Sequence, residues 1–241
     1  DTAFGGGDDY FNLGNGNNYI ELESHSNAAT IELSATSGNT TVEGFDTVND
    51  IVKLDAASAD VEYTVDGLVF TKGNASLSIQ NIEPAQNSNG SYVKVNIDDS
   101  ANDDPEVETA IAMKDAAIKV EDENTKAFVG SNSALDFSDY SNAVAITLGT
   151  GEGILANNSA NTITLRGITS LKGGSDEHTL IGAGDQSNTL SAGTGEGTIW
   201  GQGASGDLLI AADYSADKSA STFMYESGDG ADTISKKNRY L

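Results

Sequence analysis

The stretch 4-FGGGDDYFNLGNGNNYIEL-22 contains one nine-residue pattern twice. Each copy places glycines first, then an acidic or amide residue, and then a large apolar residue two positions later. The apolar residues that keep a spacing of nine are Phe4, Leu13, Leu22 and Ile31. A repeat of about nine residues is too short for a helical repeat unit and is typical of a parallel β-helix. The stretch therefore predicts a parallel β-roll or β-solenoid.

The same pattern suits calcium. Glycine lets a tight turn adopt positive φ and bring its carbonyl oxygens inward without a Cβ clash. Two such turns stacked on one edge offer several carbonyl oxygens and two carboxylates, and calcium takes about six to eight oxygen ligands. Because these oxygens repel one another without an ion, we expect folding to be coupled to calcium binding.

The short repeat returns after residue 170. The apolar residues of this second array, spaced nine or ten apart, are Leu171, Leu180, Leu190, Ile199 and Leu209. Glycine-rich turns separate them, and 228-GDGADTI-234 restores the full glycine, Asp and apolar pattern. We therefore expect two β-roll arrays in one chain.

The heptad 228-GDGADTI-234 matches the core of the consensus GGxGxDxUx, and the chain thereby resembles the RTX (repeats-in-toxin, hemolysin-type calcium-binding) proteins. Residues 135–151, 161–174 and 223–234 are similar to strand-and-roll segments of large members of that family. The resemblance covers roughly 1–45 and 130–235. It implies a parallel β-roll, calcium between coils, export by a type I secretion system, and a place in an adhesin, a surface layer or a secreted enzyme.

The position of the consensus Asp varies, which predicts that only some turns bind calcium. Asparagine still offers a neutral oxygen at Asn18, Asn27 and Asn188, whereas Gly197 has no side chain and His178 is a poor calcium ligand. The residues expected to bind calcium are Gly7, Asp9, Gly16, Asn18, Asp176, Asp185, Asp207, Asp229, Gly230 and Asp232. Asp9 with Asn18, and the turn at Asp232, are the better candidates. The alternative is a metal-free roll, in which Asn side chains form hydrogen-bonded ladders.

The middle of the chain predicts a different β structure. Apolar and polar residues alternate over 61–65, Asp66-Gly67 follows, and 68–70 is apolar, which is the pattern of a β-hairpin. Residues 75–82 and 91–97 indicate further strands. Pro105, with acidic residues in the turn after it, predicts a helix over 105–117.

The predicted fold is therefore all-β, with parallel β-roll arrays on either side of an antiparallel β module and one short helix. The expected divisions are a first array at 1–45, an antiparallel module at 46–97, an acidic linker with the helix at 98–126, and strands leading into the second array at 127–241. Both arrays start or stop within a repeat, so we expect this sequence to be part of a longer chain.

Composition excludes several classes of function. The chain has 37 Asp and Glu against 12 Lys and Arg, a formal charge of −25, which argues against nucleic-acid binding. It has no cysteine, so disulfides and zinc–thiolate sites are excluded. No apolar run approaches the roughly 18 residues that span a bilayer. No HExxH or GxSxG motif occurs, and we expect no enzymatic activity.

These features favour a structural segment of an extracellular surface-layer, adhesin or filament protein, secreted and stiffened by calcium. Open roll ends predict self-association or contact with neighbouring modules of the same chain. The alternatives are the secretion and folding module of an enzyme, such as a protease or polysaccharide lyase, and a module that binds cell-surface glycans. A row of Thr179, Thr189 and Thr198 keeps ice binding as a minor alternative.

Overall fold

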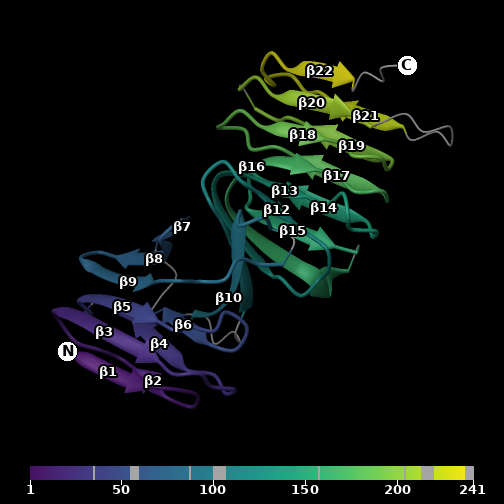
Figure 1. Ribbon diagram of the computed structural model, residues 1–241. Coiled ribbons are helices and arrows are strands. Elements are labelled where there is room, and N and C mark those ends of the chain that lie inside the picture. The colour runs from purple at the N-terminus through teal and green to yellow at the C-terminus, as the bar shows by residue number, and fades with distance from the viewer. Residues whose placement is uncertain are drawn as a thin grey trace. The chain divides into compact units, whose positions relative to one another are not determined.

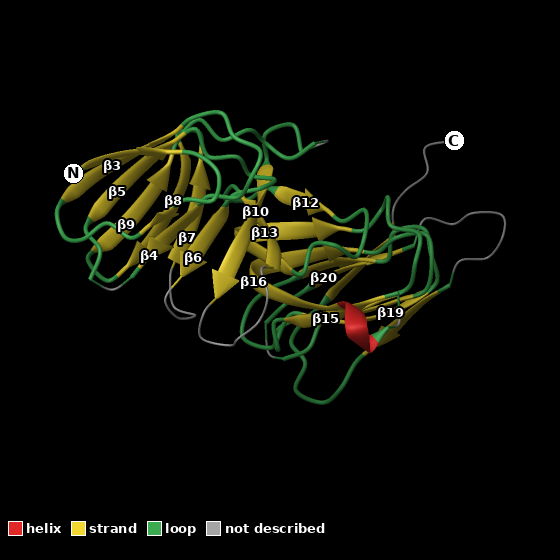
Figure 2. Cartoon of the chain, turned by 90° about the horizontal axis from the view of Figure 1, so that it is seen from below, coloured by secondary structure: helices red, strands yellow, loops and turns green. Residues whose placement is uncertain are grey.

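The computed structural model describes residues 1–34, 36–54, 60–86, 88–99, 107–156, 158–203, 205–212 and 220–236. The chain divides into two compact units, Asp1–Met113 (unit 1) and Lys114–Leu241 (unit 2) (Figure 1). Strands account for 52% of the residues and helix for 1%, which confirms the all-β expectation. Figure 2 shows strands and loops throughout, with a single helical turn. In the described part of the chain, no helix has the length and apolar character needed to cross a membrane.

Unit 1 is a β-roll of two parallel ladders with antiparallel strands added. Its strands are β1 (Thr2–Gly5), β2 (Tyr10–Phe11), β3 (Asn17–Leu22), β4 (Thr30–Leu33), β5 (Asn39–Glu43), β6 (Ile51–Leu54), β7 (Asp60–Thr64), β8 (Gly67–Lys72), β9 (Ala75–Ile79), β10 (Tyr92–Asp99) and β11 (Val107–Ala112). One ladder runs β1-β3-β5-β9 and the other runs β2-β4-β6-β10, and every pairing in them is parallel.

The nine-residue pattern is half of one coil. Tyr10 pairs with Thr30, and Thr30 pairs with Ile51, so a full coil takes 20 or 21 residues. Consecutive repeats therefore supply strands to opposite ladders. The apolar residue of each repeat points into the core, where Ile20 is fully buried and Ile31 is 1% exposed. Alternation along each strand, with a period of two, puts its polar neighbours outside.

The hairpin in the middle of the chain is confirmed. β7 and β8 pair antiparallel from Asp60 with Thr71 to Thr64 with Gly67. Their two-residue loop is Val65-Asp66, one position earlier than predicted, so Val65 lies at the tip and is 90% exposed. The predicted strands at 75–82 and 91–97 are β9 and β10, and β9 extends the roll by pairing parallel with β5.

The helix predicted over 105–117 is wrong. Residues 107–112 form β11, which pairs antiparallel with β10 and places Ile111 opposite Val93. The described run from Thr109 to Ala112 is buried at every position, whereas a surface helix would bury one stripe. A short apolar run does not distinguish a strand from a helix by periodicity alone, and ladder formation with β10 decides it. Residues 105 and 106 lie outside the described residues.

Unit 2 contains the second roll. Its elements are β12 (Ala117–Lys119), β13 (Ala127–Asp136), β14 (Val144–Thr147), β15 (Glu152–Leu155), the helical turn η1 (Ser159–Asn161), β16 (Thr162–Lys172), β17 (His178–Ile181), β18 (Thr189–Ser191), β19 (Gly197–Trp200), β20 (Leu208–Ala211), β21 (Ser221–Met224) and β22 (Thr233–Lys236). The parallel ladders are β16-β18-β20-β22 and β14-β17-β19-β21. Before them, β14, β15 and β16 pair antiparallel.

The core of the second roll follows the predicted spacing. The five apolar residues, each at most 2% exposed, are Leu171, Leu180, Leu190, Ile199 and Leu209. They alternate between the two ladders, as the offset of 19 residues between Thr189 and Leu208 requires. The same alternation divides the expected threonine row, because Thr179 and Thr198 pair in one ladder while Thr189 lies in the other.

Candidate metal site

Turns that lie at one edge of a roll are two repeats apart in the sequence. Because Tyr10 pairs with Thr30, Asp9 is followed on its edge by Ala29 in the next coil. Asn18 belongs to the other ladder, where its neighbour is Thr40. The structure therefore does not bring Asp9 and Asn18 together, and the pair that we expected to form a good calcium site is separated by the width of the roll.

The predicted residues of unit 1 have protein partners already. The Asn18 side chain is buried, and its Nδ2 donates to the Gly14 carbonyl at 2.9 Å. The Asp9 carboxylate is exposed and accepts from the Gly6 amide at 2.8 Å. Gly7 allows close packing of coils, since a Cβ there would lie 2.6 Å from the Asn27 oxygen. These residues cap turns and do not form a cation cage.

The corresponding turns in unit 2 stack differently. We call the turns 182–188, 201–207 and 225–232, in their described residues, the Asp207 edge. A row of side chains follows this edge from coil to coil. The Asn188 amide donates to Asp207 Oδ1 at 2.6 Å, and the Asp207 amide donates to Asp232 Oδ1 at 3.1 Å. Each carboxylate thus ties one coil to the one before it.

One oxygen of this row is left over. Asp207 is only 3% exposed, and its Oδ2 has no hydrogen-bond partner among the described residues. Gly201 makes room for that oxygen, because a Cβ at residue 201 would lie 2.4 Å from it. Burial raises the pKa of Asp207, and the nearby charges of Asp232 and Asp229 raise it further. A buried carboxylate oxygen without a donor is costly, which makes this the position where a cation fits best.

Asp229 lies in the same edge but is saturated. Its carboxylate accepts from the Glu226 amide at 2.7 Å, from Trp200 Nε1 at 2.9 Å and from the Gly203 amide at 3.1 Å. The Glu226 amide bond, and then the Trp200 bond, lower the pKa of Asp229. The Gly230 amide donates to the Gly203 carbonyl at 2.6 Å. Both predicted residues therefore shape the turn around Asp207.

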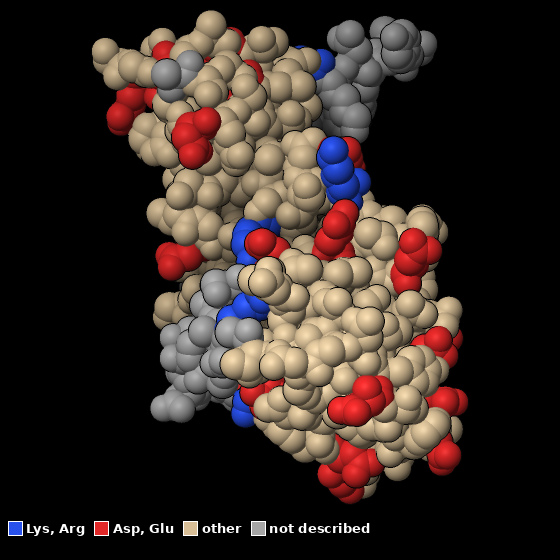
Figure 3. All heavy atoms as spheres, turned by 90° about the vertical axis from the view of Figure 1, so that its left-hand side faces the viewer, with Lys and Arg blue, Asp and Glu red and all other residues tan. Residues whose placement is uncertain are grey.

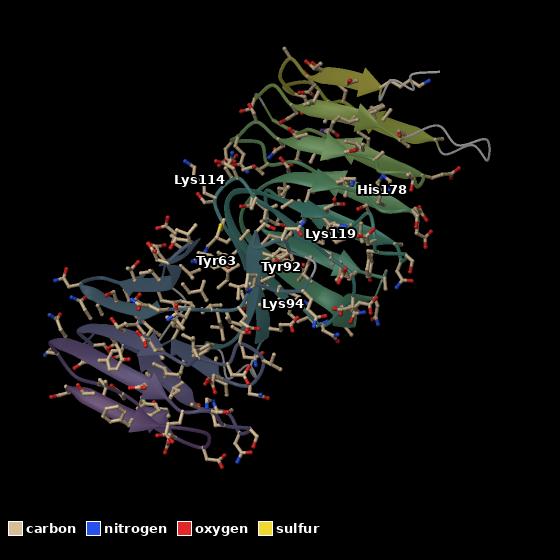
Figure 4. The ribbon with its side chains drawn as sticks, in the orientation of Figure 1. Tyr63, Tyr92, Lys94, Lys114, Lys119 and His178 are labelled. Atoms are coloured by element: carbon tan, nitrogen blue, oxygen red, sulfur yellow. The ribbon has the colours of Figure 1, made fainter. Side chains whose placement is uncertain are left out.

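The remaining predicted residues are not at the buried oxygen. Asp185 is exposed in the turn 182–188 of the Asp207 edge, and Asp176 lies at the opposite edge, where it accepts from the Glu177 amide at 2.8 Å. Beside Asp176, the ring of His178 is 2% exposed and fills the space over Gly197, where a Cβ would meet Nε2 at 2.1 Å (Figure 4). Burial lowers the pKa of His178.

The donor set at the Asp207 edge is mixed. In the parts of the chain that the structure describes, no three His, Cys, Asp or Glu residues come together as a metal-holding group. Two carboxylates, Asp207 and Asp232, are coupled in the row, so a cation there would draw its other ligands from backbone and amide oxygens. Calcium accepts such oxygens readily, whereas metals that prefer imidazole or thiolate do not. The residues fit a hard cation at Asp207.

Sequence reasoning missed two residues that matter at these edges. Asn188 was noted as a substitution but not included among the site residues, although it donates to Asp207. Asp50 was not considered, although it stands two residues before the buried Val52, as the consensus requires. The glycines that mark the other turns are missing from 46–50, and that absence hid the signal.

Comparison with known proteins gives no family assignment. No family model matches the chain, and no curated protein matches it. Among solved structures, one similar chain is the extracellular lipase LipA from Serratia marcescens, at 15% identity and a TM-score of 0.30. The similarity covers 90% of this chain and 33% of the lipase, so the chain spans about a third of that protein's length. A TM-score of 0.30 does not establish a common fold.

Proposed function

We propose that this chain is a non-catalytic structural segment of a secreted or cell-surface protein, built from β-rolls and stiffened by calcium at the Asp207 edge. A surface-layer, adhesin or extracellular filament protein is the kind of parent that such a segment serves. The observation that carries the proposal is the Oδ2 atom of Asp207, which is buried, lacks a donor among the described residues, and faces a gap left by Gly201.

A cation at this edge would act as a staple between coils. The side chains of Asp207 and Asp232 already link three successive turns through backbone amides. Calcium would supply positive charge that offsets their repulsion and would complete the coordination of Asp207 Oδ2. The protein's own part is to hold both carboxylates in place, exclude water from Asp207, and keep Gly201 small. The folded state would then gain stability from the ion.

The charge of the chain supports an extracellular setting. On the face shown in Figure 3, Asp and Glu are scattered over the surface and Lys and Arg are few. With a formal charge of −25, the folded state repels itself, and this repulsion falls where salt and divalent cations are plentiful. Conditions outside a cell provide both.

Self-association is the second part of the proposal. Ile234 on β22 is in register with the buried Leu209, yet it is 61% exposed because no coil follows it in the described residues. Repeat structures need a cap or a neighbour over such a surface. We therefore propose that a second copy or a neighbouring module packs on β22.

Calorimetric titration of calcium into the full chain tests the metal site. We expect saturable binding in the wild type and none at that site in Asp207→Asn, because the amide removes the charged ligand. Asp185→Asn is the matched control, since this exposed residue of the preceding turn is not in the row. Wild-type protein that binds no calcium, or Asp207→Asn that binds as the wild type does, would contradict the proposal.

A further inference from the structure

A second buried carboxylate, in unit 1, is closed by a side chain instead of a vacancy. We call the turns 6–9, 23–29 and 44–50 the His25 edge. Asp50 in this edge is fully buried. Its Oδ1 accepts from the Ala29 amide at 2.8 Å and lies 2.7 Å from His25 Nε2, and its Oδ2 accepts from the Asp46 amide at 2.8 Å. Both oxygens of Asp50 are thus satisfied.

The partners of His25 define its charge. Nε2 faces the Asp50 carboxylate, and Nδ1 lies 2.5 Å from the Glu23 carbonyl oxygen. Neither partner has a hydrogen to donate, so both ring nitrogens must carry one, and the ring is an imidazolium. A neutral ring would leave one of these contacts without its hydrogen. The His25 side chain is 7% exposed, so water does not readily replace it.

The surroundings of His25 favour the positive charge. The ring borders a cavity of about 350 Å³ whose charged lining residues, besides His25 itself, are Asp46 and Glu83. No Lys or Arg is among those lining residues. The hydrogen bond to the Glu23 carbonyl, followed by that to Asp50, raises the pKa of His25 above its usual 6.5, although burial opposes this.

Asp50 stands in unit 1 where Asp207 stands in unit 2. Each ends a turn and precedes a buried apolar residue, Val52 or Leu209, by two positions. Because Asp50 has three donors and no free oxygen, a metal ion does not fit there. We propose that protonated His25 takes the place of a cation at Asp50 and ties the turn 23–29 to the turn 44–50, so that this edge is closed by protons and not by calcium.

The pH dependence of this closure has a definite sign. The folded state holds the proton more tightly than the unfolded state does, so the contribution is fully present below pH 6.5. It is lost as the pH rises through the higher pKa of the folded state. This inference depends on the contacts of His25 alone and stands whether or not calcium binds at Asp207.

The two histidines of the chain make a direct test possible. Long-range ¹H–¹⁵N NMR of the full-length His178→Gln variant reports the charge of the His25 ring alone. We expect a doubly protonated ring with a midpoint above 6.5 that is the same in excess calcium and in chelator. A midpoint at or below 6.5 would overturn the proposal. A midpoint that falls when calcium is added would also overturn it, because calcium would then compete for the site.

Thermal melts separate this role from simple packing. In the His178→Gln background, Tm should rise as the pH is lowered from about pH 8 to about pH 5.5. The same rise should be absent in His25→Gln and in Asp50→Asn, each of which removes one charge of the pair. If these variants keep the rise, His25 is not the group that responds. If they fail to fold, the NMR midpoint of the His178→Gln protein still decides.

Discussion

At the scale of single residues, glycine positions record how closely the coils approach. Gly197 is opposite His178 in the parallel ladder, and the imidazole lies where a Cβ of residue 197 would be. The sequence showed that both residues depart from the Asp of the consensus, but not that one departure accommodates the other. Such a pair is invisible to a nine-residue pattern, since its members are 19 residues apart and meet only after the coil closes.

This contact predicts the effect of one methyl group. Gly197→Ala should destabilise the protein by about 1–3 kcal/mol, because a Cβ at 2.1 Å from His178 Nε2 forces a buried ring or its strand to shift. Gly14→Ala is the control: nothing lies within 4 Å of its added Cβ, and we expect a change of less than about 0.5 kcal/mol. Urea denaturation of both variants measures this. Equal stability of the two would show that the His178 ring does not occupy this space.

At the scale of elements, local signals were predicted well and long-range pairing was not. The hairpin β7–β8 was found from an Asp-Gly pair between alternating residues, because a two-residue turn is a local feature. The strand β11 was mistaken for a helix, since its apolar run becomes a strand only by pairing with β10. The candidate site was half predicted: Asp207 and Asp232 were included, and their pairing through backbone amides required the register of the ladders.

The edge strand β22 predicts the oligomeric behaviour. Ile234 exposes a core position, so the wild-type chain should associate with increasing concentration, and Ile234→Asp should shift the equilibrium toward the monomer by placing a charge in the apolar contact. Sedimentation equilibrium at several concentrations measures both. The control is Val65→Asp, because Val65 is exposed at a hairpin tip and has no core register. A wild-type chain that stays monomeric would contradict this use of β22.

At the scale of the whole molecule, two rolls with the same repeat close their edges in different ways. In unit 1 the buried Asp50 is neutralised by His25, and in unit 2 the buried Asp207 has an oxygen without a donor among the described residues. The composition showed an excess of acid but not which carboxylates are buried, and burial decides which of them needs a counter-charge. The chain therefore combines one edge that responds to protons with one that we propose responds to calcium.

Thermal melting of the full chain at constant pH, in excess calcium and in chelator, decides whether calcium stabilises the fold. In the wild type we expect a higher Tm with calcium. In Asp207→Asn we expect no calcium response and, in chelator, a gain of about 1–3 kcal/mol over the wild type, because a buried charge without a partner has been removed. The two proteins should therefore change order between the two conditions. The same wild-type Tm with and without calcium would contradict the calcium site and leave a metal-free roll.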